Sequence, residues 1–238
     1  MIDNYAVAKV KLDYKKYQSF MYTGINGILM NINHFILEFG ITENQNKHIL
    51  EIGGGTNPHY KWIKKGRYNT YTICDVENHN DSLPLNVTFI RENEFDDKDH
   101  QNRYTRIIAS HVLEHLANPE EQILSWCSML TNEGILSIAL PCDPGLFWHF
   151  CRKVSYPKAK QVYGITSKER NLIMAREHIN SIYNLLYIMD YYFEKNKKFW
   201  FPALIPINNF NLLCVIQLKK KHFANFESSK INDDNFTP

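Results

Sequence analysis

The sequence lacks long apolar runs and lacks a strong excess of either charge. Its apolar stretches are broken by polar residues well short of the roughly 20 residues that a membrane-spanning helix needs, and the N-terminus, MIDNYAVAKVKLDYKK, has no apolar signal core. The 27 Lys and Arg residues nearly balance the 25 Asp and Glu residues and form no basic stripe. These absences argue against stable membrane insertion, against nucleic-acid partners and against export from the cytoplasm.

Cysteine is scarce and has no paired spacing. Its number is odd, and several cysteines lie within apolar runs typical of a core: Cys74, Cys127, Cys142, Cys151 and Cys214. This pattern predicts reduced thiols and a cytoplasmic protein. The close cysteine pairs of a zinc site are missing, and His111 and His115, four positions apart, lack a third ligand in the sequence around them. The sequence therefore predicts no metal site.

What is present is an alternation of short apolar runs and helical patterns. The runs that predict strands cover residues 48–52, 70–75, 86–90, 106–110, 135–140, 197–201 and 212–218. Helical spacing over 119–130 predicts a helix that Asn132-Glu133-Gly134 stops. The alternation favours an α/β, Rossmann-like fold, with a mostly parallel seven-stranded sheet, helices on both faces and a C-terminal antiparallel hairpin.

The same pattern divides the chain into segments. Residues 1–47 predict an N-terminal helical cap, residues 48–218 the ligand-binding α/β domain, and residues 219–238 a flexible polar tail. Within the domain, residues 142–178 form a long, irregular, aromatic-rich insertion, which we interpret as a substrate lid ahead of a helix over 179–193. A single domain that acts as a monomer or a homodimer fits this length.

The first strand leads into a glycine-rich turn, Glu51-Ile52-Gly53-Gly54-Gly55-Thr56-Asn57. Glycines at such a turn let the backbone approach a ligand closely, and the strand-end Glu51 can hold part of it. Asp75 ends the second strand, where a carboxylate can accept both hydroxyls of a ribose. A nicotinamide-nucleotide site would need a third glycine at the position of Pro58, so that alternative loses weight, and Pro58 is expected to begin the next helix.

The turn resembles motif I of the class I S-adenosylmethionine (SAM)-dependent methyltransferases, with Asn57 in place of the last glycine, a residue that tolerates left-handed backbone. The segment Ser110-His111-Val112-Leu113-Glu114-His115-Leu116-Ala117-Asn118-Pro119 is similar to the segment after strand four in methyltransferases related to the ubiquinone and menaquinone biosynthesis enzymes. The resemblance implies SAM as cofactor and S-adenosylhomocysteine (SAH) as product. It assigns cofactor binding to Glu51, Gly53, Gly54, Gly55, Asn57, Asp75, Val76, Glu92, Asn93, Ser110 and His111.

Within that resemblance, His111 is expected near the methionine end of the cofactor, and Val76 with Glu92 or Asn93 near the adenine. His149 and His178, in or beside the predicted lid, are the candidate catalytic bases for a hydroxyl acceptor.

We therefore expect methyl transfer to a small molecule, with oxygen on a sugar, polyketide, phenol or acid as the favoured acceptor. Three alternatives stay open: N- or C-methylation of a small molecule, a nicotinamide-dependent reductase, and a non-catalytic partner subunit that keeps the fold.

Overall fold

The computed structural model describes residues 20–64, 67–78, 82–193 and 196–220, so most of the predicted tail and the first part of the N-terminal cap lie outside it. Seven strands form one sheet in the order β3-β2-β1-β4-β5-β7-β6. The strands are β1 (His48–Ile52), β2 (Thr70–Asp75), β3 (Val87–Arg91), β4 (Tyr104–Ser110), β5 (Leu130–Pro141), β6 (Asn196–Pro202) and β7 (Asn211–Lys219). β1 to β5 are parallel, whereas β7 runs antiparallel to both β5 and β6. The predicted fold is confirmed.

The central strands are mostly apolar because both faces of the sheet are covered. Ile49 and Leu50, neighbours on β1, point to opposite faces, and both are fully buried. Leu50 pairs with Thr72 on β2 and with Ile107 on β4, so β1 lies inside the sheet. The run therefore lacks the polar alternation of a strand with one wet face.

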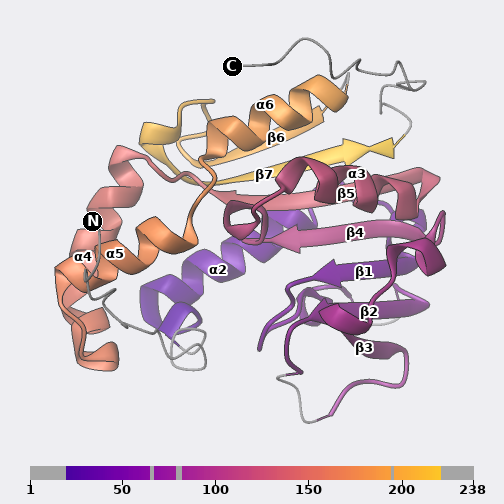
Figure 1. Ribbon diagram of the computed structural model, residues 1–238, viewed down its shortest axis with the longest axis horizontal. Helices are drawn as coiled ribbons and strands as arrows, with labels where there is room; N and C mark the ends of the chain where they lie inside the picture. Colours follow the sequence, from indigo (N-terminus) through magenta and orange to yellow (C-terminus); the bar gives the residue numbers. More distant parts are fainter. Residues whose placement is uncertain (1–19, 65–66, 79–81, 194–195, 221–238) are drawn as a thin grey trace, which may run out of the picture.

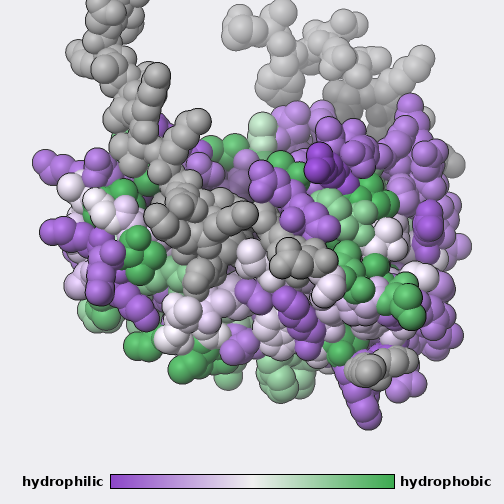
Figure 2. Space-filling model, turned by 90° about the horizontal axis from the view of Figure 1, so that it is seen from below, coloured by the Kyte–Doolittle hydropathy of each residue, from purple (hydrophilic) through white to green (hydrophobic). Residues whose placement is uncertain are grey.

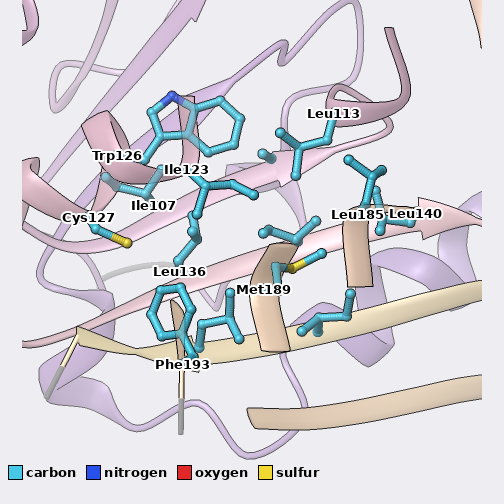
Figure 3. Packing of buried hydrophobic residues seen from close by; sticks show 14 of the residues in the cluster. Ile107, Leu113, Ile123, Trp126, Cys127, Leu136, Leu140, Leu185, Met189 and Phe193 are labelled. Carbon is cyan, nitrogen blue, oxygen red and sulfur yellow. The ribbon is translucent and has the colours of Figure 1, made fainter. Parts of the chain in front are cut away.

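Helices pack on both sides (Figure 1). On one face, α3 (Pro119–Met129) and α6 (Ile182–Tyr192) pack on β4, β5 and β7, and Figure 3 shows Ile123, Trp126 and Met189 reaching into that core. On the other face α2 (Gly24–Leu37) crosses β5 and β7, with Leu37 in a second buried cluster. α2 lies within the segment for which an N-terminal helical cap was predicted.

The expectation for the end of α3 is wrong. Asn132-Glu133-Gly134 does not stop the helix, because α3 ends at Met129 and β5 already begins at Leu130. Tyr104 pairs with Leu130 but Arg106 pairs with Ile135, so the extra residues form an irregularity within the strand pair.

The insertion over 142–178 is helical rather than irregular. It consists of α4 (Leu146–Tyr163) and α5 (Ser167–Glu177), joined by a tight turn. Gly164 ends α4 in the left-handed conformation, and Thr166 with Glu169 forms a capping box that starts α5. Figure 1 shows both helices beyond the carboxyl ends of the parallel strands. They therefore lie at the end of the sheet where an insertion that binds a ligand would lie.

Seen from the β3 edge, the surface carries small, separate hydrophobic patches between hydrophilic residues (Figure 2). In the part of the chain that the structure describes, no helix has both the length and the apolar character needed to cross a membrane.

Candidate functional site

The carboxyl ends of β1 to β4 meet at one edge of the sheet, and the predicted cofactor residues all lie at these ends. β1 and its loop supply Glu51, Gly53, Gly54, Gly55 and Asn57; β2 supplies Asp75 and Val76; β3 is followed by Glu92 and Asn93; β4 supplies Ser110 and His111. The strand order reverses direction between β1 and β4, where open α/β sheets bind ligands. The structure thus brings residues 60 positions apart in sequence to one edge.

The glycine turn requires glycine for steric reasons. Gly53 has a φ of +71° and Gly55 a φ of +55°, a region that side chains with a Cβ rarely occupy. A Cβ on Gly53 would lie 2.7 Å from Cγ2 of Val112, so the loops after β1 and β4 touch at this point. The turn is a cradle of bare backbone between two strand ends.

The chain does not enter an α-helix after this turn, contrary to the expectation for Pro58. Only a short 3₁₀ turn, η2 (His59–Lys61), follows. The backbone N–H of His59 donates to both carboxylate oxygens of Glu51, at 2.9 and 3.0 Å, and draws the chain back against β1. Asn57 is not among the positive-φ residues, so the turn does not require a left-handed backbone at this position.

Glu51 is the buried acid at the end of β1, with 3% of its surface exposed. Besides the His59 amide, it accepts a hydrogen bond of 2.7 Å from the hydroxyl of Tyr71. Burial raises the pKa of Glu51 to about 7, against the opposing effect of the hydrogen bond from Tyr71. The buried carboxylate of Glu51 therefore stabilises the conformation of the glycine turn through these hydrogen bonds.

Because the pKa of Glu51 is higher in the folded chain than its ordinary value of 4.5, folding favours its protonated form. Its contribution to stability is complete below pH 4.5 and is lost as the pH rises through about 7. Relative to Glu51→Gln, the unfolding free energy of the natural chain should fall by about 3 kcal/mol across that range. Urea unfolding at several pH values measures this, and parallel curves for the two proteins would contradict it.

Asp75 ties the end of β2 to the glycine turn. One carboxylate oxygen, Oδ2, accepts from the N–H of Gly55 at 2.7 Å, and the other accepts from the N–H of Val76 at 2.6 Å. The pairing of turn and acid expected from the sequence is thus a direct contact. Val76, Glu92 and Asn93 are exposed around it.

The end of β4 carries the second half of the site. Ser110 accepts a hydrogen bond of 3.0 Å from the Asn33 side chain of α2. His111 follows with a φ of +57°, an uncommon conformation for a residue with a Cβ. Its Nδ1 lies 3.4 Å from Oε1 of Glu114, while its Nε2 is buried with no hydrogen-bond partner among the residues that the structure describes. One ring nitrogen thus faces a carboxylate, and the other is buried without a partner.

Glu114 is a functional candidate that the sequence analysis did not single out. Burial alone would raise its pKa, but His111, with smaller effects from His115 and His178, holds the pKa of Glu114 below its usual value. A carboxylate with 2% exposure is therefore ionised beside three imidazoles. Its only sequence signal is a charged residue directly after the apolar pair Val112-Leu113.

His111 opens onto a mostly apolar cavity of about 120 Å³ between α2, α4, α5 and β7. Its apolar walls come from Leu29, Met30, Trp148, Ile173, Met174, Leu212 and Leu213. Polar groups are few, and they include Arg152 and Arg170. The insertion helices therefore close a chamber against the residue at the end of β4.

The two candidate bases His149 and His178 do not line this chamber. They line a neighbouring polar cavity of about 430 Å³, together with Asp143 and Arg152. His178 Nδ1 lies 2.9 Å from Oδ2 of Asp143, and His149 is exposed. Arg152 reaches both cavities, so the two are adjacent.

Comparison with known proteins identifies this architecture. A family model described as a methyltransferase domain matches residues 26–186. A SAM-dependent methyltransferase from Archaeoglobus fulgidus, 12% identical, aligns over 87% of this chain and all (100%) of its own with a TM-score of 0.58. The plantazolicin methyltransferase BpumL in complex with SAH is 17% identical over 86% of this chain and 89% of its own, with a TM-score of 0.55.

A further solved structure, the CurJ carbon methyltransferase, is 14% identical over 85% of this chain and 57% of its own, with a TM-score of 0.57. No curated protein matches the chain. At these identities the solved structures establish the fold, while the family model covers more than half of the sequence. The chain therefore belongs to the class I SAM-dependent methyltransferases.

Proposed function

We propose that this methyltransferase methylates a hydroxyl oxygen on a small molecule with an apolar body. The observation that carries the proposal is the buried Nε2 of His111, which has no hydrogen-bond partner among the described residues and belongs to a side chain that lines the apolar chamber. A buried nitrogen without a partner is costly unless a ligand supplies the hydrogen bond. A hydroxyl on an otherwise apolar acceptor fits both the chamber and the imidazole.

The cofactor residues are proposed from the same edge of the sheet. The bare backbone of the turn at Gly53 and Gly55 would let the methionine portion approach beside Ser110 and His111, and the Asp75 carboxylate would accept the two ribose hydroxyls. Val76, Glu92 and Asn93 would surround the adenine. This assignment is supported by the positive φ of Gly53 and Gly55, a backbone conformation that keeps the turn free of side chains.

SAM supplies a methyl group already activated on a sulfonium sulfur, which leaves as the thioether of SAH when the methyl carbon bonds to the acceptor. His111 holds the acceptor by accepting its hydroxyl hydrogen at Nε2, and it takes that proton as the oxygen–carbon bond forms. Glu114, at 3.4 Å from Nδ1, stabilises the charge that the ring acquires. The apolar walls exclude water and fix the approach of the oxygen.

The nature of the acceptor atom is tested with methyl-labelled SAM and a series of acceptors that share one apolar body and differ in carrying a hydroxyl, an amine or an activated carbon. We expect label on oxygen, identified by NMR of the product. Label on nitrogen or carbon would replace the hydroxyl acceptor with one of those classes. The carbon methyltransferase named above shares only the fold with this chain, so it does not favour carbon.

His111→Gln is expected to slow turnover by about 10²-fold or more, because a general base contributes about 10²–10⁴-fold. The affinity for SAH should be nearly unchanged, since the glycine turn and Asp75 are intact. Steady-state kinetics and calorimetric titration with SAH measure the two effects separately.

The matched control is His149→Gln, which alters an exposed histidine of the neighbouring cavity. It should turn over at the natural rate. If His149→Gln slows turnover while His111→Gln does not, the base is His149, one of the two candidates from the sequence.

A further inference from the structure

Glu114, His115 and His178 form a cluster at the carboxyl end of β4. One potential ligand atom from each residue lies within 4.8 Å of the others. Glu114 and His115 belong to the short turn η5 (Leu113–His115), whereas His178 is the residue that ends α5. The sequence around His111 and His115 contains no third residue of this kind, because His178 comes from a distant segment.

Backbone hydrogen bonds hold the two segments of the cluster together. The N–H groups of Ile179 and Asn180 both donate to the carbonyl of Glu114, at 2.9 and 3.1 Å. The side-chain amide of Asn180 donates to the carbonyls of Leu113 and Leu116, at 3.0 and 2.6 Å. The cluster is therefore fixed by the fold and does not depend on the three side chains meeting by chance.

Both imidazoles are oriented by an oxygen acceptor. His115 Nδ1 lies 2.8 Å from the carbonyl of Glu177, and His178 Nδ1 lies 2.9 Å from the Asp143 carboxylate. An imidazole that donates from Nδ1 keeps its lone pair on Nε2, and this is the arrangement found behind histidines that ligate metals. The Nε2 of His115 lies 3.8 Å from Oε1 of Glu114.

The carboxylate of Glu114 supplies an independent observation. Only 2% of the residue is exposed, and among the described residues neither of its oxygens has a hydrogen-bond partner. A buried carboxylate without hydrogen bonds is strongly unfavourable unless a cation compensates it. His111 contacts one oxygen at 3.4 Å, which leaves coordination capacity on the carboxylate.

We propose that Glu114, His115 and His178 bind a divalent transition-metal ion. Two imidazoles with one carboxylate favour ions such as Zn²⁺, Co²⁺ or Fe²⁺ over Mg²⁺ and Ca²⁺, which prefer oxygen ligands alone. Three protein ligands leave coordination positions open, and His178 lines the polar cavity of about 430 Å³ beside them.

The open positions would hold an oxygen of the methyl acceptor near His111, and this second statement rests on the proposed function. A hydroxyl bound to the ion would lose its proton more readily and would be aligned for methylation. Binding of the ion itself does not depend on what the enzyme methylates.

The test uses the full chain, freed of metal with a chelator and titrated with Co²⁺ in a calorimeter and a spectrophotometer. We expect one Co²⁺ per chain, with visible bands of nitrogen and oxygen coordination, and much weaker binding of Mg²⁺. His115→Gln and His178→Gln should each weaken Co²⁺ binding by at least about tenfold, and Asp143→Asn by about 10–100-fold, because second ligand shells act on that scale. Glu114→Gln should do the same as the histidine variants.

His149→Gln is the matched control, because it alters another histidine of the same cavity and should bind Co²⁺ like the natural chain. Thermal unfolding shows whether each variant folds, and Co²⁺ should raise the melting temperature of the natural chain by mass action.

Three results would overturn the site: no Co²⁺ binding, thiolate bands from cysteine coordination, or equal Co²⁺ binding by the histidine variants. If Co²⁺ binds but no ether product forms, the ion site stands and only the hydroxyl acceptor is excluded. If an ether product forms without ion binding, the hydroxyl acceptor stands and the ion site is excluded.

Discussion

Arg106→Met is expected to lower the free energy of unfolding by about 3–5 kcal/mol, because it breaks a buried charge network by removing one partner. Arg106 lies on β4 with no exposed surface. Its guanidinium donates to Ser137 Oγ at 3.0 Å, to Asn46 Oδ1 at 2.8 Å, to the carbonyl of Leu37 at 2.7 Å and to the carboxylate of Glu38. The network joins β4 and β5 to the end of α2. Urea unfolding measures the loss.

The cost comes mainly from what Arg106 leaves behind. Burial acts to raise the pKa of Glu38, but the hydrogen bond from His59 and the charge of Arg106 lower it to about 2, so the carboxylate stays ionised. Adding Glu38→Gln to Arg106→Met should therefore cost less than the sum of the two single changes. Arg67→Met is the control, since Arg67 is exposed and sits 3.9 Å from Glu43, and it should change stability by less than about 0.5 kcal/mol. Equal losses for Arg67 and Arg106 would contradict the prediction.

The sheet could be predicted because each strand carries its own signal. A strand buried on both faces has to be mostly apolar, and the runs 48–52 and 135–140 are apolar apart from His48, Glu51 and Ser137. The start of β5 could not be predicted, because residues 131–134 are polar and contain a glycine, which also describes a loop. Only the pairing of Tyr104 with Leu130 makes that segment part of the strand.

The insertion shows a signal that was present but not used. Thr166 and Glu169 have the spacing of a capping box, and Gly164 precedes them. This pattern predicts the start of α5. The many aromatic residues over 142–163 obscured the helical pattern of α4. The face of α4 toward the chamber is apolar in places, and its other face is exposed. The interpretation of this segment as a ligand-covering element stays a prediction.

At the site, the glycine turn and Asp75 could be predicted because parallel strands bring their carboxyl ends to one edge of the sheet. The contacts that depend on distant segments could not. The chain at His59 turns back onto β1 because the backbone N–H of His59 donates to the carboxylate of Glu51. No sequence pattern in the turn predicts this hydrogen bond. Likewise His178 reaches Glu114 only because Asn180 clamps the end of α5 to the turn after β4.

Asp75→Ala should weaken SAH binding by about 10²–10⁴-fold, while the chain stays folded. An ionised carboxylate that accepts two ribose hydroxyls contributes about 1.5–3 kcal/mol for each hydrogen bond, and about 1.4 kcal/mol corresponds to a factor of ten. The change also frees the N–H of Gly55, which the carboxylate now holds at 2.7 Å, so the turn loses its fixed shape as well as a ligand contact.

Asp75→Asn keeps one oxygen acceptor and should lose less affinity. Glu77→Ala, an exposed acid two residues further on, is the matched control and should bind SAH normally. Calorimetric titration with SAH compares the three variants, and equal affinity for Asp75→Ala and Glu77→Ala would remove Asp75 from the ribose contact, even though its place beside the glycine turn would stand.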